Sequence, residues 1–394
     1  MSRTIITNGK LILPTEIWDN GYLIFNNDKI VEIGKGQHPE GLSDTIIDAE
    51  QNYISPGFID IHTHGAGGFD FMDATVEAFL KIAETHAKYG TTSLLPTTLT
   101  STNEELFHLF DIYSQSKNLN IKGAKFIGIH LEGPYFSYNQ RGAQDPKYLR
   151  IAEEKDYLEI LNATSDIVRW SIAPEIEGAI PLGELLVKKG ILPSVGHTDA
   201  ISDDVMEAFD SGFTLMTHLY SGMSTITRRK AFRYAGALEA AFLIDDMDVE
   251  IIADGVHLPK SLLQFVFKFK GADRIALVTD SMRGAGMPDG YYKLGSISNG
   301  QDVLVEDGVA KLQDRSAFAG SVATADRLIR TMTTIAEVPL VDAVKMLTYT
   351  PARIMGIHNE KGSLAVGKFA DIIIFNDLIE IKMTIVEGEI IYKV

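Results

Sequence analysis

The sequence predicts an α/β fold in which a (β/α)8 TIM-type barrel carries a small β-sandwich that both ends of the chain build together. Three observations support this prediction. In the middle of the chain, short β-rich runs alternate with amphipathic stretches long enough for crossover helices, which is typical of parallel β/α units. Both ends are instead turn-rich and alternate apolar with polar residues. With 394 residues, the chain has room for one barrel-sized domain and a small accessory domain.

The first predicted element is the N-terminal part of the sandwich, residues 1–54. It contains the runs IITNGKLILP, NGYLIFNNDKIVEIGKG and DTIIDAEQNYI and lacks a strong helical pattern. Residues 356–394 repeat this style in KGSLAVGKFADIIIFN and KMTIVEGEIIYKV. We therefore expect the two ends to meet in one β-sandwich.

The barrel is predicted over residues 55–355. Its eight strand candidates are, in order, ISPGFIDIH, TTSLLPTT, KFIGIHLEG, IVRWSIAPE, LPSVGHTD, FTLMTHLY, VEIIADGVH and RIALVTDS. Helical patterns between them include Ala74 to Tyr89, Ser202 to Asp210 and Lys260 to Lys270. Residues 287–318 read as β-hairpins inserted after the eighth strand. We expect a flap over the active site, and a hairpin without function is the alternative.

Five residue clusters fall near the predicted C-terminal ends of strands, where barrel enzymes place their catalytic residues. The clusters hold His62 and His64, Glu132, His197, His218 and Asp280. Strand periodicity puts His62 and His64 on one face, although a lone histidine is as often structural. Imidazoles and carboxylates are the ligands of a hydrolytic divalent metal, and the chain has no cysteine to add a thiolate. The clusters therefore predict a metal-dependent hydrolase.

The net charge of -17 and a pI near 5.0 argue against a nucleic-acid partner. A local cluster of basic residues, Arg228, Arg229, Lys230 and Arg233, is compatible with an anionic small substrate or with a solvated loop. Neither a secretory signal nor an apolar run long enough to span a bilayer is recognisable. We therefore expect a cytoplasmic protein without a membrane partner.

Several motifs together resemble the amidohydrolase superfamily and, within it, the N-acetylglucosamine-6-phosphate deacetylase family. The most specific are HLEGP, IADGVH and TDSMRGAGMPDG, beside PGFIDIHTHG, GHTDA, THLYSGMS and TPARIMGI. Many amidohydrolases bridge two metals with a carboxylated lysine on strand four, but the run SIAPE offers no lysine. The resemblance instead gives the shared-ligand role to Glu132.

The same resemblance implies the remaining roles. His197 and His218 join Glu132 around one metal, and His62 and His64 hold a second metal beside Asp280. One or two divalent ions are expected, with zinc and iron both suited to these ligands. Asp280 serves as the base that takes the proton of the attacking water and passes it to the departing amine. His257 is expected to contact the sugar.

The phosphate-binding segment departs from the family pattern. Where the family usually has Asn-Ala, this chain has Ser221 and Gly222, and Arg229 falls in register with the family's phosphate-binding arginine. The expected substrate is N-acetylglucosamine-6-phosphate. The alternatives are N-acetylgalactosamine-6-phosphate, an unphosphorylated amino sugar, another amide, or a metal-free scaffold protein. The resemblance also implies a homodimer.

Overall fold

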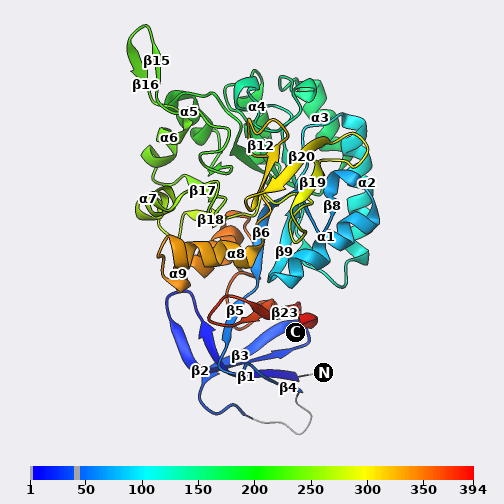
Figure 1. Ribbon diagram of the computed structural model, residues 1–394, viewed down its shortest axis with the longest axis vertical. Coiled ribbons are helices and arrows are strands. Elements are labelled where there is room, and N and C mark those ends of the chain that lie inside the picture. Colours follow the sequence, from blue (N-terminus) through cyan, green and yellow to red (C-terminus); the bar gives the residue numbers. More distant parts are fainter. Residues whose placement is uncertain (1–2, 40–44) are drawn as a thin grey trace.

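The computed structural model describes residues 3–39 and 45–394 (Figure 1). A barrel with surrounding helices lies above a smaller β-sheet that holds both ends of the chain. The side chain of Arg229 is outside the described part. Among the described residues, no helix is both long and apolar enough to cross a membrane.

Both ends of the chain contribute strands to one sheet with the order β24-β23-β22-β5-β1-β2-β3, and β4 pairs with β1. The N-terminal strands are β1 (Arg3–Ile12), β2 (Ile17–Asn26), β3 (Lys29–Lys35), β4 (Thr45–Asp48) and β5 (Tyr53–Pro56). The C-terminal strands are β22 (Ile372–Phe375), β23 (Ile381–Val386) and β24 (Glu389–Lys393). Antiparallel pairing of β5 with β22, in which Ile54 faces Ile374, joins the two groups. A two-layer sandwich and domain limits near residues 55 and 355 stay predictions.

Each of the eight barrel runs contains a strand at the expected place, and neighbouring barrel strands pair in parallel. The first group is β6 (Phe58–Thr63), β9 (Thr91–Pro96) and β10 (Lys125–Phe126). The second is β11 (Ile129–Glu132), β12 (Ile167–Ile172), β13 (Leu192–Val195), β14 (Leu215–Met216), β17 (Asp248–Ile251) and β18 (Ile275–Leu277). β6 and β9 are buried along their whole length, as expected of barrel strands covered on both faces.

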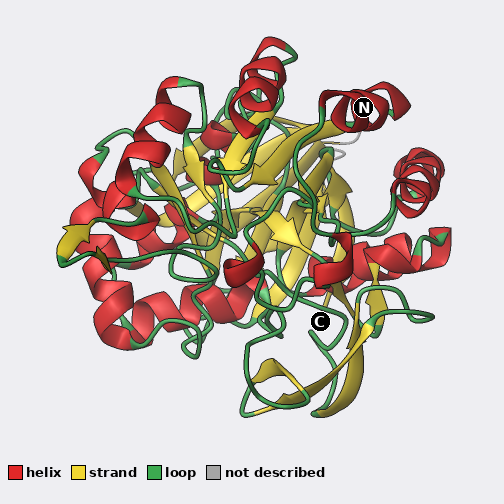
Figure 2. Cartoon of the chain, turned by 90° about the horizontal axis from the view of Figure 1, so that it is seen from above, coloured by secondary structure: helices red, strands yellow, loops and turns green. Residues whose placement is uncertain are grey.

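The sheet curls into a barrel with helices outside it, as the view from above shows (Figure 2). The helices are α1 (Val76–Lys88), α2 (Asn103–Leu119), α3 (Glu154–Ala163), α4 (Ala179–Lys188), α5 (Ser202–Asp210), α6 (Ala237–Leu243), α7 (Lys260–Lys270), α8 (Ala325–Arg330), α9 (Leu340–Met346) and α10 (Tyr349–Ile354). In α2, Thr102 and Glu105 form a capping box, and the spacing of Leu106, Leu109 and Phe110 turns one face toward the core.

Three hairpin-like additions interrupt the barrel. Their strands are β7 (Gly65–Ala66) with β8 (Phe69–Asp70), β15 (Thr227–Arg229) with β16 (Phe232–Tyr234), and β19 (Gly290–Leu294), β20 (Gln301–Glu306) and β21 (Val309–Leu312). The last group is the predicted insertion after the eighth strand, and it forms a three-stranded antiparallel sheet. The β15–β16 hairpin projects beyond the barrel (Figure 1).

Candidate metal centre

The predicted ligands meet at the C-terminal ends of the barrel strands and form two triads that share Glu132. One triad is Glu132, His197 and His218, and the other is Glu132, His62 and His64. Within each triad the ligand atoms all lie within 4.8 Å of one another, and all five residues are buried. Two neighbouring metal positions with one common carboxylate are therefore compatible with the geometry.

The two oxygens of Glu132 face different neighbours. Oε1 lies 3.2 Å from Nε2 of His197 and 3.0 Å from Nε2 of His218. Oε2 lies 3.3 Å from Nε2 of His64. One carboxylate thus reaches toward both halves of the site.

Asp280 lies beside the second triad. Its Oδ1 is 3.1 Å from Nε2 of His64 and 3.4 Å from Nε2 of His62. The structure therefore brings together all six residues that the sequence analysis proposed as metal ligands.

The donor set fits a divalent metal ion. Nε2 of His62 is buried and makes no hydrogen bond, although carboxylate oxygens of Asp280 and Glu132 lie 3.4 and 3.5 Å away. A buried polar atom without a hydrogen bond is costly, so Nε2 of His62 is suited to bind a metal ion. Imidazole nitrogens and carboxylate oxygens are suitable donors for a divalent transition metal.

The electrostatics of the site show how closely these groups interact. Burial lowers the pKa of His62, but the carboxylates of Glu132 and Asp280 outweigh burial and raise it to about 9. Burial likewise opposes ionisation of Glu132, yet the facing histidines hold its pKa well below its usual range. The pKa of Asp280 is also lowered, against burial, by His62 and His64. Without a metal, both carboxylates are therefore ionised.

Three of the site residues have a left-handed backbone. The φ angles are 47° at His197, 28° at His218 and 45° at Asp280. Residues with side chains rarely adopt this region, and such strain concentrates at functional sites. Its presence directly after three barrel strands supports a functional role for these positions.

Neighbouring residues orient the histidines. Nδ1 of His197 lies 2.8 Å from the carbonyl oxygen of Gln140, so its Nε2 faces Glu132. Nδ1 of His62 lies 3.3 Å from Oε2 of Glu250, which is fully buried. Hydrogen bonds of this kind fix the tautomer and direction of metal-ligating histidines.

Glu250 belongs to a buried network that the sequence analysis missed. Arg169 donates to its Oε1 and, at 3.1 Å, to the carbonyl oxygen of Ile61. Burial raises the pKa of Glu250, but Arg169 and His62 more than offset it and hold the pKa at about 2. A charged residue within each of two apolar runs, VRWSI and VEIIA, is the signal that could have identified this pair.

A cavity of about 270 Å³ opens over the triads. Three predicted substrate-binding residues, His257, Ser221 and Gly222, line it together with five of the six metal-site residues, all except His62. The inserted segment contributes Leu294, Ala317 and Phe318 to the same wall.

His257 is held in the cavity wall by two neighbours. Its Nδ1 lies 2.8 Å from Oδ2 of Asp254, and its ring centroid is 4.7 Å from that of Phe318. At Gly222, φ is 57°, and a Cβ atom would lie 2.8 Å from Nδ1 of His197. This close approach explains why glycine suits the position where the family usually has alanine.

Arg229 ends β15, on the hairpin that projects from the barrel. Because its side chain lies outside the described part, its predicted contact with phosphate stays a prediction. The neighbouring Phe232 is 73% exposed.

A model of the amidohydrolase family matches residues 53–391, which include every residue of the metal centre. The chain belongs to the amidohydrolase family. Within it, the chain is a member of the N-acetylglucosamine-6-phosphate deacetylase family, as relatives along its whole length show.

The N-acetylglucosamine-6-phosphate deacetylase of Bacillus subtilis (strain 168) is 31% identical over 392 residues, covering 98% of this chain and 97% of the relative. The N-acetylgalactosamine-6-phosphate deacetylase of Escherichia coli O157:H7 is 30% identical, covering 98% and 99%. Among solved structures, a mutant N-acetyl-D-glucosamine-6-phosphate deacetylase of Mycobacterium smegmatis in complex with N-acetyl-D-glucosamine-6-phosphate superposes with a TM-score of 0.91. Its sequence is 30% identical, and the match covers 100% of both chains.

Proposed function

We propose that this protein hydrolyses the N-acetyl group of an N-acetyl amino sugar 6-phosphate, with N-acetylglucosamine-6-phosphate as its substrate. The observation that carries the proposal is the pair of triads sharing Glu132, with Asp280 only 3.1 Å from His64. The products are acetate and the free amino sugar phosphate. Relatives named for this activity support the choice of sugar.

The roles of the residues follow from their positions. A divalent ion held by the triads, zinc or iron, would acidify a water molecule and polarise the acetyl carbonyl. Asp280, ionised and next to the triads, accepts the proton of the attacking water and delivers it to the amine as the amide bond breaks. His257, fixed by Asp254, is placed in the wall to donate to the sugar or the carbonyl.

We assign the anionic end of the substrate to the part of the cavity lined by Ser221 and Gly222. Ser221 offers a hydroxyl and Gly222 a backbone N–H, and Arg229 supplies the positive charge. The cavity side formed by Ser221 and Gly222 lies next to His197.

N-acetylgalactosamine-6-phosphate is the second candidate substrate. Two relatives, from Escherichia coli O157:H7 and a Shewanella species, carry that activity in their names at 30% identity. The change from Asn-Ala to Ser221 and Gly222 in the phosphate-binding segment also favours a substrate other than N-acetylglucosamine-6-phosphate. The deciding experiment is acetate release from N-acetylglucosamine, N-acetylgalactosamine, N-acetylmannosamine and their 6-phosphates. Highest kcat/KM on N-acetylglucosamine-6-phosphate supports the proposal, and acetate from none of the six refutes it.

We further propose a homodimer, and a two-layer arrangement of the terminal sheet. Exposed apolar side chains on and near the projecting hairpin, Ile226 at 58% and Phe232 at 73%, support a protein partner at this place. Light scattering at several concentrations tests the dimer, and a monomer throughout would contradict it.

The two-layer arrangement is supported by the terminal sheet, which surrounds its own cluster of buried apolar residues from both chain ends, including Leu23 and Ile372.

A further inference from the structure

Asp199 is a partly buried aspartate of the GHTDA motif to which the proposed mechanism gives no role. It follows the metal ligand His197 by two positions, just after β13. It is not among the described residues that line the metal cavity. Its backbone N–H donates to Oε1 of Glu175 at 2.6 Å, and the hydroxyl of Thr198 donates to Oε2 of Glu175 at 2.5 Å. Glu175, which follows β12, therefore fixes the backbone at Asp199.

The carboxylate of Asp199 binds one short turn of 3-10 helix in the segment after β11. Its Oδ2 accepts from Oγ of Ser137 at 2.8 Å and from Nδ2 of Asn139 at 2.9 Å, and its Oδ1 accepts from Nε2 of Gln140 at 2.6 Å. The backbone N–H of Ser137 also donates to the carbonyl oxygen of His197 at 2.9 Å. The turn is therefore joined to the segment that carries His197 through both side chains and backbone.

This turn presents the carbonyl group that orients His197. A carbonyl oxygen can only accept, so Nδ1 of His197, which lies 2.8 Å from the oxygen of Gln140, carries the proton of the neutral imidazole. Nε2 is then unprotonated, faces Glu132 and has its lone pair available to a metal ion. Glycine at position 222 leaves room for this bond, since a Cβ atom on Gly222 would lie 2.7 Å from the same carbonyl oxygen.

Little apolar burial holds the turn, Tyr138–Gln140, in place. The ring of Tyr138 belongs to a residue that is 60% exposed, and Asn139 is exposed as well. Polar bonds must therefore fix the position of the turn, and Asp199 accepts three of them. Without this carboxylate, the carbonyl group of the turn would no longer be held against the imidazole.

We propose that Asp199 is a positioning residue that keeps the carbonyl group of Gln140 against Nδ1 of His197, and so directs Nε2 of His197 at the first metal position. The inference rests on the proposed metal-dependent function, since it concerns a ligand of that centre. Asp199 acts through the turn and the imidazole rather than by touching substrate or metal. Its effect is therefore confined to the ion held by Glu132, His197 and His218.

The test compares Asp199→Ala with the conservative variant Asp199→Asn, which keeps one oxygen acceptor in nearly the same place. The matched control is Asp156→Ala. Asp156 is also partly buried and also accepts from three side chains, those of Asn103, Tyr135 and Arg150.

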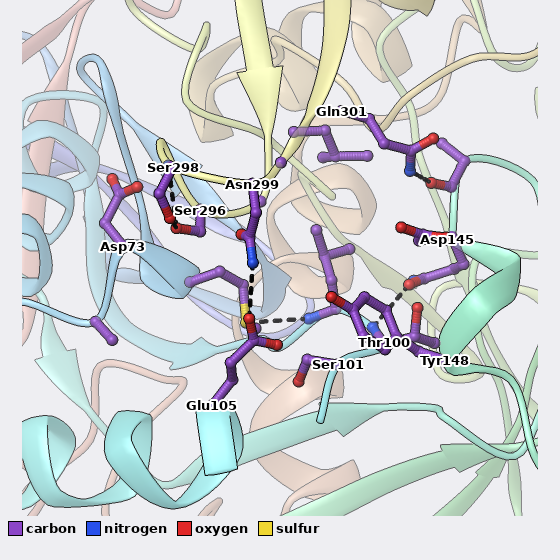
Figure 3. A pocket seen from close by; sticks show the side chains of 18 of the residues that line it. Asp73, Thr100, Ser101, Glu105, Asp145, Tyr148, Ser296, Ser298, Asn299 and Gln301 are labelled. Atoms are coloured by element: carbon purple, nitrogen blue, oxygen red, sulfur yellow. Dashed lines mark hydrogen bonds between the residues drawn. The ribbon is translucent and has the colours of Figure 1, made fainter. Parts of the chain in front are cut away.

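A second control separates the proposed effect from a general loosening at this end of the barrel. Glu105 of α2 accepts from Nδ2 of Asn299 in the inserted segment at 2.8 Å, so it joins two segments as Asp199 does. The contact lies in a second cavity of about 270 Å³, which shares Leu99 and Leu294 with the metal cavity (Figure 3). None of the described residues that line this second cavity is a predicted metal ligand. Glu105→Ala should therefore leave zinc binding unchanged.

Each protein is freed of metal and titrated with zinc against a competing chelator, and the bound ions are counted by elemental analysis. His197→Ala and the double variant that combines Asp199→Ala with His197→Ala are titrated in the same way. Thermal unfolding of the metal-free proteins checks the fold. Should Asp199→Ala not fold, Asp199→Asn and its combination with His197→Ala provide the same comparison.

Asp199→Ala is expected to bind the zinc ion of the first position about 10- to 100-fold more weakly, as is typical when a residue supporting a metal ligand is lost. Asp199→Asn should lie between Asp199→Ala and the wild type, and both controls should match the wild type. When His197 is already alanine, loss of Asp199 should not weaken zinc binding further, because the residue through which it acts is absent. A merely structural role would weaken zinc binding in both backgrounds.

Wild-type zinc affinity in Asp199→Ala would overturn the proposal, as would an equal loss in either control or an undiminished further loss in the double variant. A wild-type protein that binds no zinc would reject the metal-dependent function together with this proposal. Because the titration uses no substrate, zinc binding that Asp199→Ala weakens in a protein without deacetylase activity would support the role of Asp199 and reject only the proposed reaction.

Discussion

The backbone N–H of Asp280 donates to the carbonyl oxygen of His62 at 2.9 Å, at the seam where the last barrel strand returns to the first. This bond sets the proposed proton acceptor next to a proposed metal ligand, with Oδ1 of Asp280 3.4 Å from Nε2 of His62. Closure of the barrel and assembly of the site therefore depend on the same contact. A change confined to the side chain of Asp280 leaves this backbone bond intact.

Asp280→Asn is predicted to separate proton transfer from metal binding. Asparagine has nearly the same shape and still offers an oxygen, but it cannot accept the proton of water at neutral pH. The variant should keep its fold and the metal at Glu132, His197 and His218, while kcat falls about 10²- to 10⁴-fold. Stopped-flow or discontinuous acetate assays, with metal content measured on the same sample, check this. Near wild-type turnover with metal present would place the base elsewhere, and His257 would be tested next.

Removal of the shared carboxylate should have a larger effect on metal content than removal of one imidazole. Glu132 belongs to both triads, whereas His62 belongs to one. Glu132→Ala should therefore lose tightly held metal and nearly all activity, and His62→Ala should lose only the second ion. Elemental analysis after dialysis measures both. Full metal content in Glu132→Ala would show that the ligand assignment is wrong.

The barrel and the six ligand candidates could be predicted from sequence because both depend on local signals. Each strand is a short β-rich run, and each ligand lies at or shortly after the C-terminal end of its strand, as Glu132 and Asp280 do. All parallel barrel strands end on one face, so the sequence order of the clusters is enough to place them together. The family resemblance then supplied the individual roles.

The supporting contacts could not be predicted in this way. Arg169 and Glu250 lie on β12 and β17, which are not neighbours in the sheet, so they meet only inside the closed barrel. Gln144 lies in a loop whose path no periodicity defines, yet its amide reaches Glu132. Such pairings depend on tertiary geometry rather than on local pattern. For Arg169 and Glu250, the only signal in the sequence is a charged residue within a buried strand.

Arg229→Ala tests the assignment of the phosphate site. If the guanidinium bonds the phosphate, its loss should weaken capture of the phosphorylated sugar by roughly 1.5–3 kcal/mol, expressed as a fall in kcat/KM. The plain sugar should be nearly unaffected. Arg274→Ala is a suitable control, since that arginine binds Asp246 and Asp248 at the N-terminal ends of β17 and β18, away from the metal centre. Equal activity on plain and phosphorylated sugars, unchanged by Arg229→Ala, would argue against a phosphate site.

Glu250→Gln is predicted to destabilise the protein as well as its metal site. The variant keeps the shape of the side chain but leaves the guanidinium of Arg169, which is fully buried, without a counter-charge. Breaking a buried ion pair in this way typically costs about 3–5 kcal/mol of the free energy of unfolding. Denaturant unfolding of metal-free protein measures the effect. A loss below about 1 kcal/mol would mean that water or another group compensates Arg169.

The acid stability of the metal-free protein should depend on His86, a buried histidine outside the metal centre. Burial lowers the pKa of His86 to about 4, from an ordinary value of 6.5, and its Nε2 lies 3.0 Å from Oγ1 of Thr63. The unfolded chain therefore binds a proton between pH 6.5 and 4 that the folded protein excludes. The stabilisation from the neutral imidazole is fully present above pH 6.5 and is lost as the pH falls toward 4, by on the order of 3 kcal/mol.

His86→Gln cannot take up this proton, so its free energy of unfolding should fall less steeply over the same range. Both proteins are unfolded with urea in the presence of a chelator, so that metal release adds nothing to the difference. Parallel pH profiles for the two would show that His86 is protonated in the folded state or reaches water.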